Sequence, residues 1–270
     1  MNFLKLLDKI ANEDLFFKQT SREGALSDIT AFGKKAAAVA LPLGLAGVMS
    51  GTAKAQTTTT TDPVTAKSAL TDALQLALTL EYLEDDYYTK GLAMSGLIPT
   101  SDRPIFQQIL KHESAHVAFL KSTLTSLQVT PISKPNFNYT LNGQFSPMTS
   151  YTQFLVLAQA FEDTGVRAYK GQAGNVMSSQ AVLTAALQIH SVEARHASMV
   201  RRIRQQKGWI EGNDGGAMPS QTNAVYAGED LTTQAGFNTA TKFGAAAGSA
   251  AYDEILTTDQ SKAIANLFIV

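Results

Sequence analysis

Residues 109–117, ILKHESAHV, and residues 189–197, IHSVEARHA, each place a glutamate three positions before a histidine within an apolar helical pattern. The pairs are Glu113 with His116 and Glu193 with His196. A spacing of three residues puts both side chains of a pair on one face of an α-helix. Each pair interrupts a stripe that should face a core, and buried charge is costly unless it is paired or bound to metal. These stretches therefore predict helices with a polar centre on their inward face.

A further glutamate precedes each pair by the length of a helical hairpin. Glu81 lies 32 residues before Glu113, and Glu162 lies 31 residues before Glu193. Two antiparallel helices joined by a short loop return to the same depth over such a distance. If two such hairpins face each other, four carboxylates and two imidazoles converge on the bundle axis. The predicted metal site consists of Glu81, Glu113, His116, Glu162, Glu193 and His196.

The wider pattern predicts four long helices. Apolar residues recur at three-to-four spacing over residues 62–90, 101–128, 150–170 and 178–207. Glycines are expected to end three of these helices, at Gly91, Gly171 and Gly208. Residues 129–148 contain three prolines, which indicates a loop long enough to cross the end of a bundle. The predicted fold is all-α, an antiparallel four-helix bundle with one long crossover.

Composition narrows the chemistry. The 270 residues carry a formal net charge of −1, so no basic excess favours nucleic acid as a partner. The chain has no cysteine, which excludes disulfides, thiolate metal sites, iron–sulfur clusters and cysteine nucleophiles. Any metal must therefore be held by Asp, Glu or His, and the chain has four histidines. No stable membrane span is expected.

The N-terminal region has the pattern of an export signal. Residues 36–50, AAAVALPLGLAGVMS, form an apolar run after two lysines, and the run is too short to span a membrane. Residues 53–55, Ala-Lys-Ala, match the small-x-small pattern of a signal peptidase site, so cleavage is expected before Gln56. The alternative is that this region stays attached as helical arms, because residues 2–18 are amphipathic.

The chain is thus expected to have four parts and an exported location, in the periplasm or cell envelope. The parts are the export signal at 1–55, a linker at 56–61, the bundle at 62–208, and a C-terminal tail packed on the bundle at 209–270.

The repeated unit resembles the ferritin-like di-iron and di-manganese carboxylate family, whose four-helix bundles hold a Glu from two helices and a Glu-x-x-His from the other two. The resemblance covers about residues 62–207, and all six ligand positions are filled. It implies a cofactor of two Fe or two Mn ions, which suit oxygen and imidazole ligands. The implied roles are bridging for Glu113 and Glu193, terminal for Glu81 and Glu162, and one metal each for His116 and His196.

The tail at residues 226–270 resembles the C-terminus of exported bacterial ferritin-like proteins, a group that includes desiccation-related proteins. This resemblance implies an exported protein that oxidises Fe(II) or removes peroxide, with dioxygen or peroxide as its partner. Two alternatives stay open. One is a manganese-catalase-like enzyme, and the other is a non-catalytic structural or stress-protective envelope protein in which metal acts as a brace. Self-association into a homo-oligomer also stays open.

A different interpretation starts from residues 112–116, HESAH, which match the His-Glu-x-x-His motif of zinc metalloproteases. In that case Glu113 would be the general base, and a third zinc ligand would come from downstream. This interpretation leaves the second Glu-x-x-His unit, at residues 193–196, without a role.

Five more residues are candidates for contacts that support the ligands: His112, His190, Glu84, Tyr88 and Tyr169. The two histidines precede the bridging glutamates by one and three residues, where a hydrogen bond to a ligand is within reach. Each tyrosine follows an upstream glutamate by seven residues. The resemblance implies that a tyrosine there hydrogen-bonds a ligand or transfers an electron, and the alternative is that it packs in the core. Glu84 lies about one helical turn from Glu81, where it competes as a ligand or is solvated.

Overall fold

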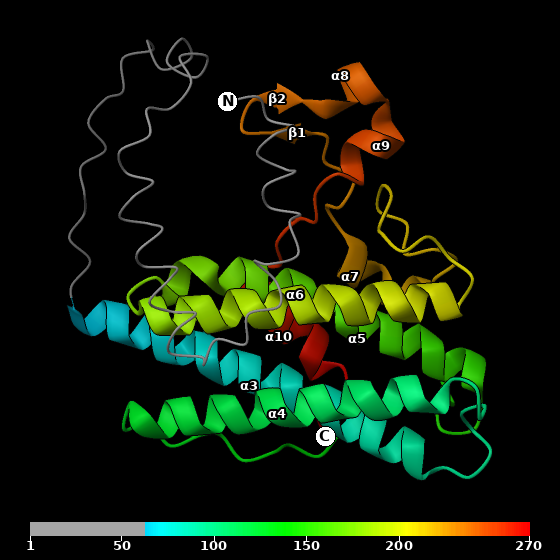
Figure 1. The fold of residues 1–270 in the computed structure, drawn as a ribbon, viewed down its shortest axis with the longest axis horizontal. Helices are drawn as coiled ribbons and strands as arrows, with labels where there is room; N and C mark the ends of the chain where they lie inside the picture. Colours follow the sequence, from blue (N-terminus) through cyan, green and yellow to red (C-terminus); the bar gives the residue numbers. More distant parts are fainter. Residues whose placement is uncertain (1–62) are drawn as a thin grey trace, which may run out of the picture. The chain divides into compact units, whose positions relative to one another are not determined.

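The computed structural model describes residues 63–270, so the expected export signal and linker lie outside the described residues (Figure 1). Four long helices form a bundle: α3 (Pro63–Ala93), α4 (Arg103–Ser126), α5 (Tyr151–Gln172) and α6 (Gln180–Ile203). In Figure 1, α3 and α4 run antiparallel as one hairpin, and α5 and α6 run antiparallel as a second. The all-α bundle predicted from the sequence is confirmed.

The connection between the hairpins, residues 127–150, returns the chain along the bundle to the start of α5. It is part of the core, because Phe137, Tyr139 and Phe145 are buried. The Tyr139 hydroxyl lies 3.2 Å from the carbonyl oxygen of Leu83 and 2.8 Å from a carboxylate oxygen of Asp86, both on α3. The crossover is therefore fastened to the first hairpin along its length.

The predicted helix ends at Gly91 and Gly171 are wrong. Both glycines lie inside their helices, and both mark places where another segment comes very close. A Cβ on Gly91 would lie 2.3 Å from the ring of Phe154, and a Cβ on Gly171 would lie 2.0 Å from the carbonyl oxygen of Leu256. Glycine is used here for close packing, which a single-chain pattern cannot distinguish from a helix stop.

The predicted end of the last long helix at Gly208 is also wrong, because α6 ends five residues earlier. The left-handed positions that follow α4 and α6 are occupied by Gln128 and Gln205, each with φ of 61°. After α6, the Gln206 amide donates to the carbonyl oxygen of Arg201 at 2.9 Å, as in a Schellman cap. These helices thus end on a non-glycine left-handed residue.

Residues 204–270, here called the C-terminal segment, contain only short elements. They are η3 (Ser220–Thr222), α7 (Asn223–Tyr226), β1 (Thr233–Gln234), β2 (Phe237–Asn238), α8 (Thr239–Phe243), α9 (Ala245–Ser249) and α10 (Thr258–Asn266). The strands pair antiparallel, with Thr233 opposite Asn238. Helix α10 packs against α3 and α5, and the Val270 amide donates to the carbonyl oxygen of Asn136 at 3.0 Å. The chain end is thereby joined to the crossover.

The bundle core has apolar layers on both sides of a charged one. Leu78 and Leu120 lie buried on one side of the layer of glutamates, and Phe106, Phe154 and Val200 lie buried on the other. This arrangement follows from the apolar stripes of the sequence, in which the charged residues occupy the middle. Among the helices of residues 63–270, none is both long and apolar enough to cross a bilayer.

Candidate metal centre

The structure brings together all six residues that the repeat selects. Each long helix contributes: Glu81 from α3, Glu113 and His116 from α4, Glu162 from α5, and Glu193 and His196 from α6. The four glutamates are 0% exposed, and the histidine side chains are 12% and 5% exposed. Within each Glu-x-x-His unit, one turn of helix places both side chains on the inner face.

These side chains form two overlapping groups of possible metal ligands, and in each group the ligand atoms lie within 4.8 Å of one another. The first group is Glu81, Glu113, His116 and Glu193, and the second is Glu113, Glu162, Glu193 and His196. Two carboxylates, Glu113 and Glu193, belong to both groups. They are the residues for which the family resemblance implies a bridging role.

In the first group, the three carboxylates surround one imidazole nitrogen. The Nδ1 atom of His116 lies 3.1 Å from Glu81 Oε2, 3.0 Å from Glu113 Oε2 and 3.2 Å from Glu193 Oε1. A single ring nitrogen carries at most one proton, so it cannot satisfy three acceptors.

The second group repeats this geometry. The Nδ1 atom of His196 lies 2.8 Å from Glu113 Oε1, 3.2 Å from Glu162 Oε2 and 3.7 Å from Glu193 Oε2. By hydrogen-bond geometry, Glu113 Oε1 and both carboxylate oxygens of Glu193 are buried without a donor among the described residues. Buried carboxylate oxygens without donors are costly, and positively charged ions at the two positions would compensate them. The donor set of oxygens and imidazole nitrogens therefore fits two metal ions.

A comparison with known protein families agrees with this geometry. The family model of the ferritin-like domain matches residues 69–206, which include all six residues of the two groups. The chain belongs to the ferritin-like domain family. The resemblance noted in the sequence is thus confirmed at the level of the family. Among curated proteins, no sequence matches the chain.

In this ferritin-like domain, two tyrosines link the hairpins. The Tyr169 hydroxyl of α5 donates to Glu81 Oε1 of α3 at 2.5 Å, and the Tyr88 hydroxyl of α3 donates to Glu162 Oε1 of α5. Each tyrosine therefore contacts the upstream glutamate of the other hairpin, not of its own. The sequence left open whether these tyrosines hydrogen-bond a ligand or only pack in the core. In the structure both tyrosines are buried, and each donates a hydrogen bond to a candidate ligand.

The other two histidines have different surroundings. His112 Nδ1 lies 2.8 Å from His196 Nε2, with the two rings stacked at a centroid distance of 5.1 Å and an angle of 7°. Since His196 Nδ1 faces the carboxylates, His112 holds the opposite edge of a candidate ligand. His190 Nδ1 instead lies 2.9 Å from the carbonyl oxygen of Val166, and within residues 63–270 His190 forms no hydrogen bond with a glutamate. His112 therefore contacts a candidate ligand, as the sequence predicts, whereas His190 contacts the backbone.

The zinc-protease interpretation of residues 112–116 is not supported by this geometry. In that motif both histidines bind one ion. Here only His116 belongs to a group of possible ligands within residues 63–270, and His112 Nδ1 is engaged with His196.

Glu84 is buried in the same layer, although it belongs to neither group of possible ligands. Burial, together with the charges of Glu193 and Glu162, raises its pKa well above the ordinary value, which favours a neutral carboxylic acid. Space for Glu84 depends on Gly165 of α5, where a Cβ would lie 3.3 Å from Glu84 Oε1 and 3.4 Å from Glu193 Oε2. Sequence reasoning missed Gly165, although a glycine inside a helix three residues after Glu162 was a usable signal.

Glu81 and His116 have raised pKa values and hold protons that a metal ion would displace. Burial raises the pKa of Glu81 to about 8, against the hydrogen bond from His116. Burial lowers the pKa of His116, but the adjacent carboxylates of Glu113, Glu193 and Glu81 outweigh it and raise the pKa to about 12. Burial acts against ionisation of Glu193 too, but the neighbouring His116 and His196 outweigh it and lower the pKa to about 2. Metal binding at such a centre releases protons and therefore strengthens as pH rises.

Proposed function

We propose that this ferritin-like domain holds two iron or two manganese ions in its bundle and uses them to oxidise Fe(II) or to remove peroxide. The observation that carries the proposal is the pair of overlapping ligand groups that share Glu113 and Glu193, with buried oxygens that lack donors. In this proposal Glu81 and His116 complete one metal position, and Glu162 and His196 complete the other. Oxygen and imidazole ligands without thiolates favour Fe or Mn over copper or structural zinc.

Two redox-active metal ions held by these residues would supply the electrons for reduction of an O–O bond. In Fe(II) oxidation, two Fe(II) ions each lose one electron, and dioxygen takes up these two electrons and two protons to give hydrogen peroxide. In peroxide removal, hydrogen peroxide would take up two protons and two electrons, one electron from each of two reduced metal ions, to give two waters. The residues of the chain position the reaction: Tyr169 and Tyr88 hold Glu81 and Glu162, and the apolar layers keep bulk water away.

The first experiment measures metal content. The full chain is expressed with Fe and Mn, elemental analysis gives ions per chain, and anomalous scattering across the Fe and Mn edges locates and identifies them. Two ions per chain at the six residues are expected. Substantially fewer than two in the unaltered protein would overturn the proposal.

Substitutions then separate the roles of the glutamates. Glu193→Ala removes a carboxylate that both groups share and should lose both ions, whereas Glu81→Ala should lose one. Glu84→Gln is the matched control, since it changes a carboxyl group buried in the same layer but outside both groups, and it should keep both ions.

Turnover assays separate the forms of the proposal. Fe(II)-dependent oxygen uptake indicates Fe(II) oxidation, whereas oxygen release from peroxide indicates manganese-catalase-like activity. If metal removal lowers the melting temperature but no turnover is measured with either substrate, the metal is a structural brace and the redox part of the proposal fails.

We also propose that the protein is exported to the periplasm or cell envelope, as in the group that includes desiccation-related proteins. The support is the apolar run at residues 36–50, followed by Ala-Lys-Ala at 53–55. The tail at 226–270 adds to it, because its sequence resembles the C-terminus of exported bacterial ferritin-like proteins. N-terminal sequencing of the natively produced protein tests it. A chain that begins at Gln56 is expected, and an intact Met1 would exclude cleavage.

A further inference from the structure

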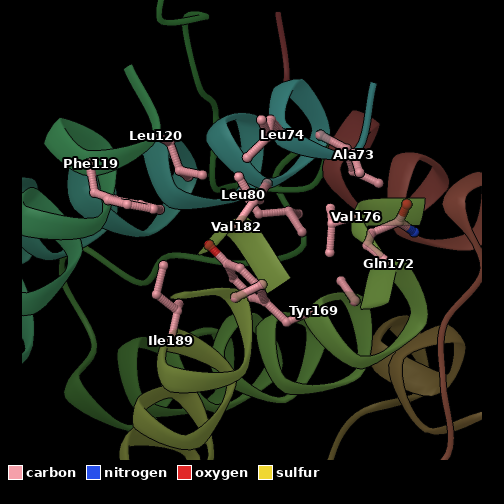
Figure 2. A pocket seen from close by; sticks show the side chains of 14 residues that line it. Ala73, Leu74, Leu80, Phe119, Leu120, Tyr169, Gln172, Val176, Val182 and Ile189 are labelled. Atoms are coloured by element: carbon pink, nitrogen blue, oxygen red, sulfur yellow. The ribbon is translucent and has the colours of Figure 1, made fainter. Parts of the chain in front are cut away.

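An apolar pocket lies beside the metal centre, at the end of the bundle where α3 and α6 begin and α4 and α5 end (Figure 2). All four long helices line it, and in Figure 2 their side chains converge on one common space. The lining is apolar except for Tyr169 and Gln172. At its outer side Phe119 is 37% exposed and Ala186 is half-buried, so these two residues mark the way in from solvent.

The pocket is adjacent to the candidate ligands along the bundle axis. Ala77 lies four residues before Glu81, Leu120 four after His116, and Ile189 four before Glu193. Four residues of helix correspond to an axial distance of about 6 Å. Tyr169 makes the connection direct, because it lines the pocket while its hydroxyl donates to Glu81 Oε1 at 2.5 Å.

The opposite side of the centre is filled. Tyr88, the counterpart of Tyr169 in the repeat, packs with Phe106 at a ring-centroid distance of 5.9 Å, and Phe106 packs with Phe154 at 5.2 Å. All three rings are fully buried. Within the described residues, packed aromatic rings thus close one end of the centre, whereas mainly aliphatic side chains leave a pocket at the other end.

The small size and the apolar lining of the pocket limit which molecules it can bind. The free space in the pocket is about 20 Å³, which admits only a very small ligand. An apolar cavity stays dry and binds apolar guests. A hydrated cation or a hydrogen-bonding molecule such as peroxide would lose its solvation here, and the Tyr169 hydroxyl is already engaged with Glu81. A small, uncharged, apolar molecule meets none of these costs.

We propose that this pocket is the route by which dioxygen reaches the side of the centre formed by Glu81 and His116. The inference rests on the proposed function, because dioxygen has a reaction there only if the centre holds redox-active metal. It adds the route, which the metal ligands alone leave undefined.

Xenon is the probe for the pocket, because it is apolar and fills dry cavities. Crystals of the full chain are pressurised with xenon, both with and without metal, and anomalous scattering locates the gas. Xenon is expected between Ala77, Tyr169 and Ile189 in both forms. If the crystals show no xenon there, the proposal is overturned even when the metal content is two ions per chain, so the two failures are distinguishable.

A pair of neighbouring alanines provides the matched substitution. Ala186→Leu places a larger side chain in the pocket, and Ala185→Leu makes the same change on the adjacent half-buried residue, which does not line the pocket. Ala186→Leu should exclude xenon and slow Fe(II) oxidation by dioxygen roughly tenfold. Oxidation by added peroxide and metal content should not change, and Ala185→Leu should behave as the unaltered protein. Equal slowing with both oxidants would overturn the selectivity for dioxygen. If Ala186→Leu folds poorly, Ala186→Val makes the same comparison with a smaller side chain.

Discussion

The α3–α4 hairpin and the α5–α6 hairpin present the same side chains to the metal centre in different surroundings. Only five of the 24 residues of α4 are buried, whereas 17 of the 22 residues of α5 are buried. The cause is the C-terminal segment, which covers the outer side of α5. The repeat in the sequence is therefore a repeat of ligands only. Within the second hairpin it is α5 that lies in the interior, since only seven of the 24 residues of α6 are buried.

The outer face of α5 shows what this covering requires. Gln159, Asp163 and Arg167 follow one another at four-residue spacing, which is typical of a solvated helix face. All three are buried. The C-terminal segment satisfies them, since Tyr226 donates to Asp163 at 2.8 Å and Gly215 accepts from Gln159 at 2.6 Å.

The largest effect expected from this difference is on folding stability. Arg167 of α5 forms an ion pair with Glu229 at 2.6 Å, and both side chains are 1% exposed. Arg167→Ala leaves Glu229 buried and unpaired, so we expect a loss of about 3–5 kcal/mol in the free energy of unfolding. Urea denaturation monitored by circular dichroism measures it.

The control lies in the first hairpin. Arg103 of α4 is half-buried and donates to the carbonyl oxygen of Leu92 at 2.6 Å. Arg103→Ala removes one hydrogen bond and should cost about 1 kcal/mol. Equal losses for the two arginines would show that the covering of α5 has no special energetic weight.

A smaller effect is expected on metal affinity, where the hairpins differ by His112. This ring supports His196, and the corresponding edge of His116 has no such partner among the described residues. His112→Ala should weaken metal binding at the half of the centre formed by Glu162 and His196 by about 10–100-fold, because the ligand ring is no longer held. Isothermal titration calorimetry with Mn(II) measures the affinities of the two binding steps separately.

His190→Ala is the matched histidine substitution, because His190 bonds a backbone carbonyl and not a candidate ligand. Both binding steps should be unchanged in it. If His112→Ala weakens both steps alike, the inequality of the two halves is refuted.

The last contrast, between the two tyrosines, is a difference of about 1–2 kcal/mol in stability. Tyr88→Phe removes the donor to Glu162 inside a filled aromatic layer, so the carboxyl group is left unsatisfied and we expect a loss of about 1–3 kcal/mol in stability. Tyr169→Phe removes the donor to Glu81 beside the pocket. The pocket is dry in the unaltered protein, but in this variant the Glu81 carboxyl group becomes a polar partner for one water. We expect a cost below about 1 kcal/mol there. Thermal unfolding of the metal-free variants compares them, and a larger loss for Tyr169→Phe would contradict the contrast between the two ends.

The sequence by itself determined the helical class, the hairpin repeat and the six residues that converge. These depend on local periodicity: a three-residue step along a helix and a hairpin-length return fix which side chains share a face and a depth. The structure confirmed the fold, and the metal-binding role of the six residues stays a prediction.

Only the tertiary structure decided which segments meet. In the structure, Tyr88 and Tyr169 each hydrogen-bond a glutamate of the opposite hairpin, and His112 contacts His196. The polar face of α5 is buried, and Gly91 and Gly171 are sites of close packing. Such contacts join residues far apart in the chain, and the local spacing of one residue does not show which distant residue it contacts. The same long-range packing fills one end of the centre and leaves a pocket at the other. How completely side chains from four helices fill a space depends on how the helices are assembled, so the sequence did not predict it.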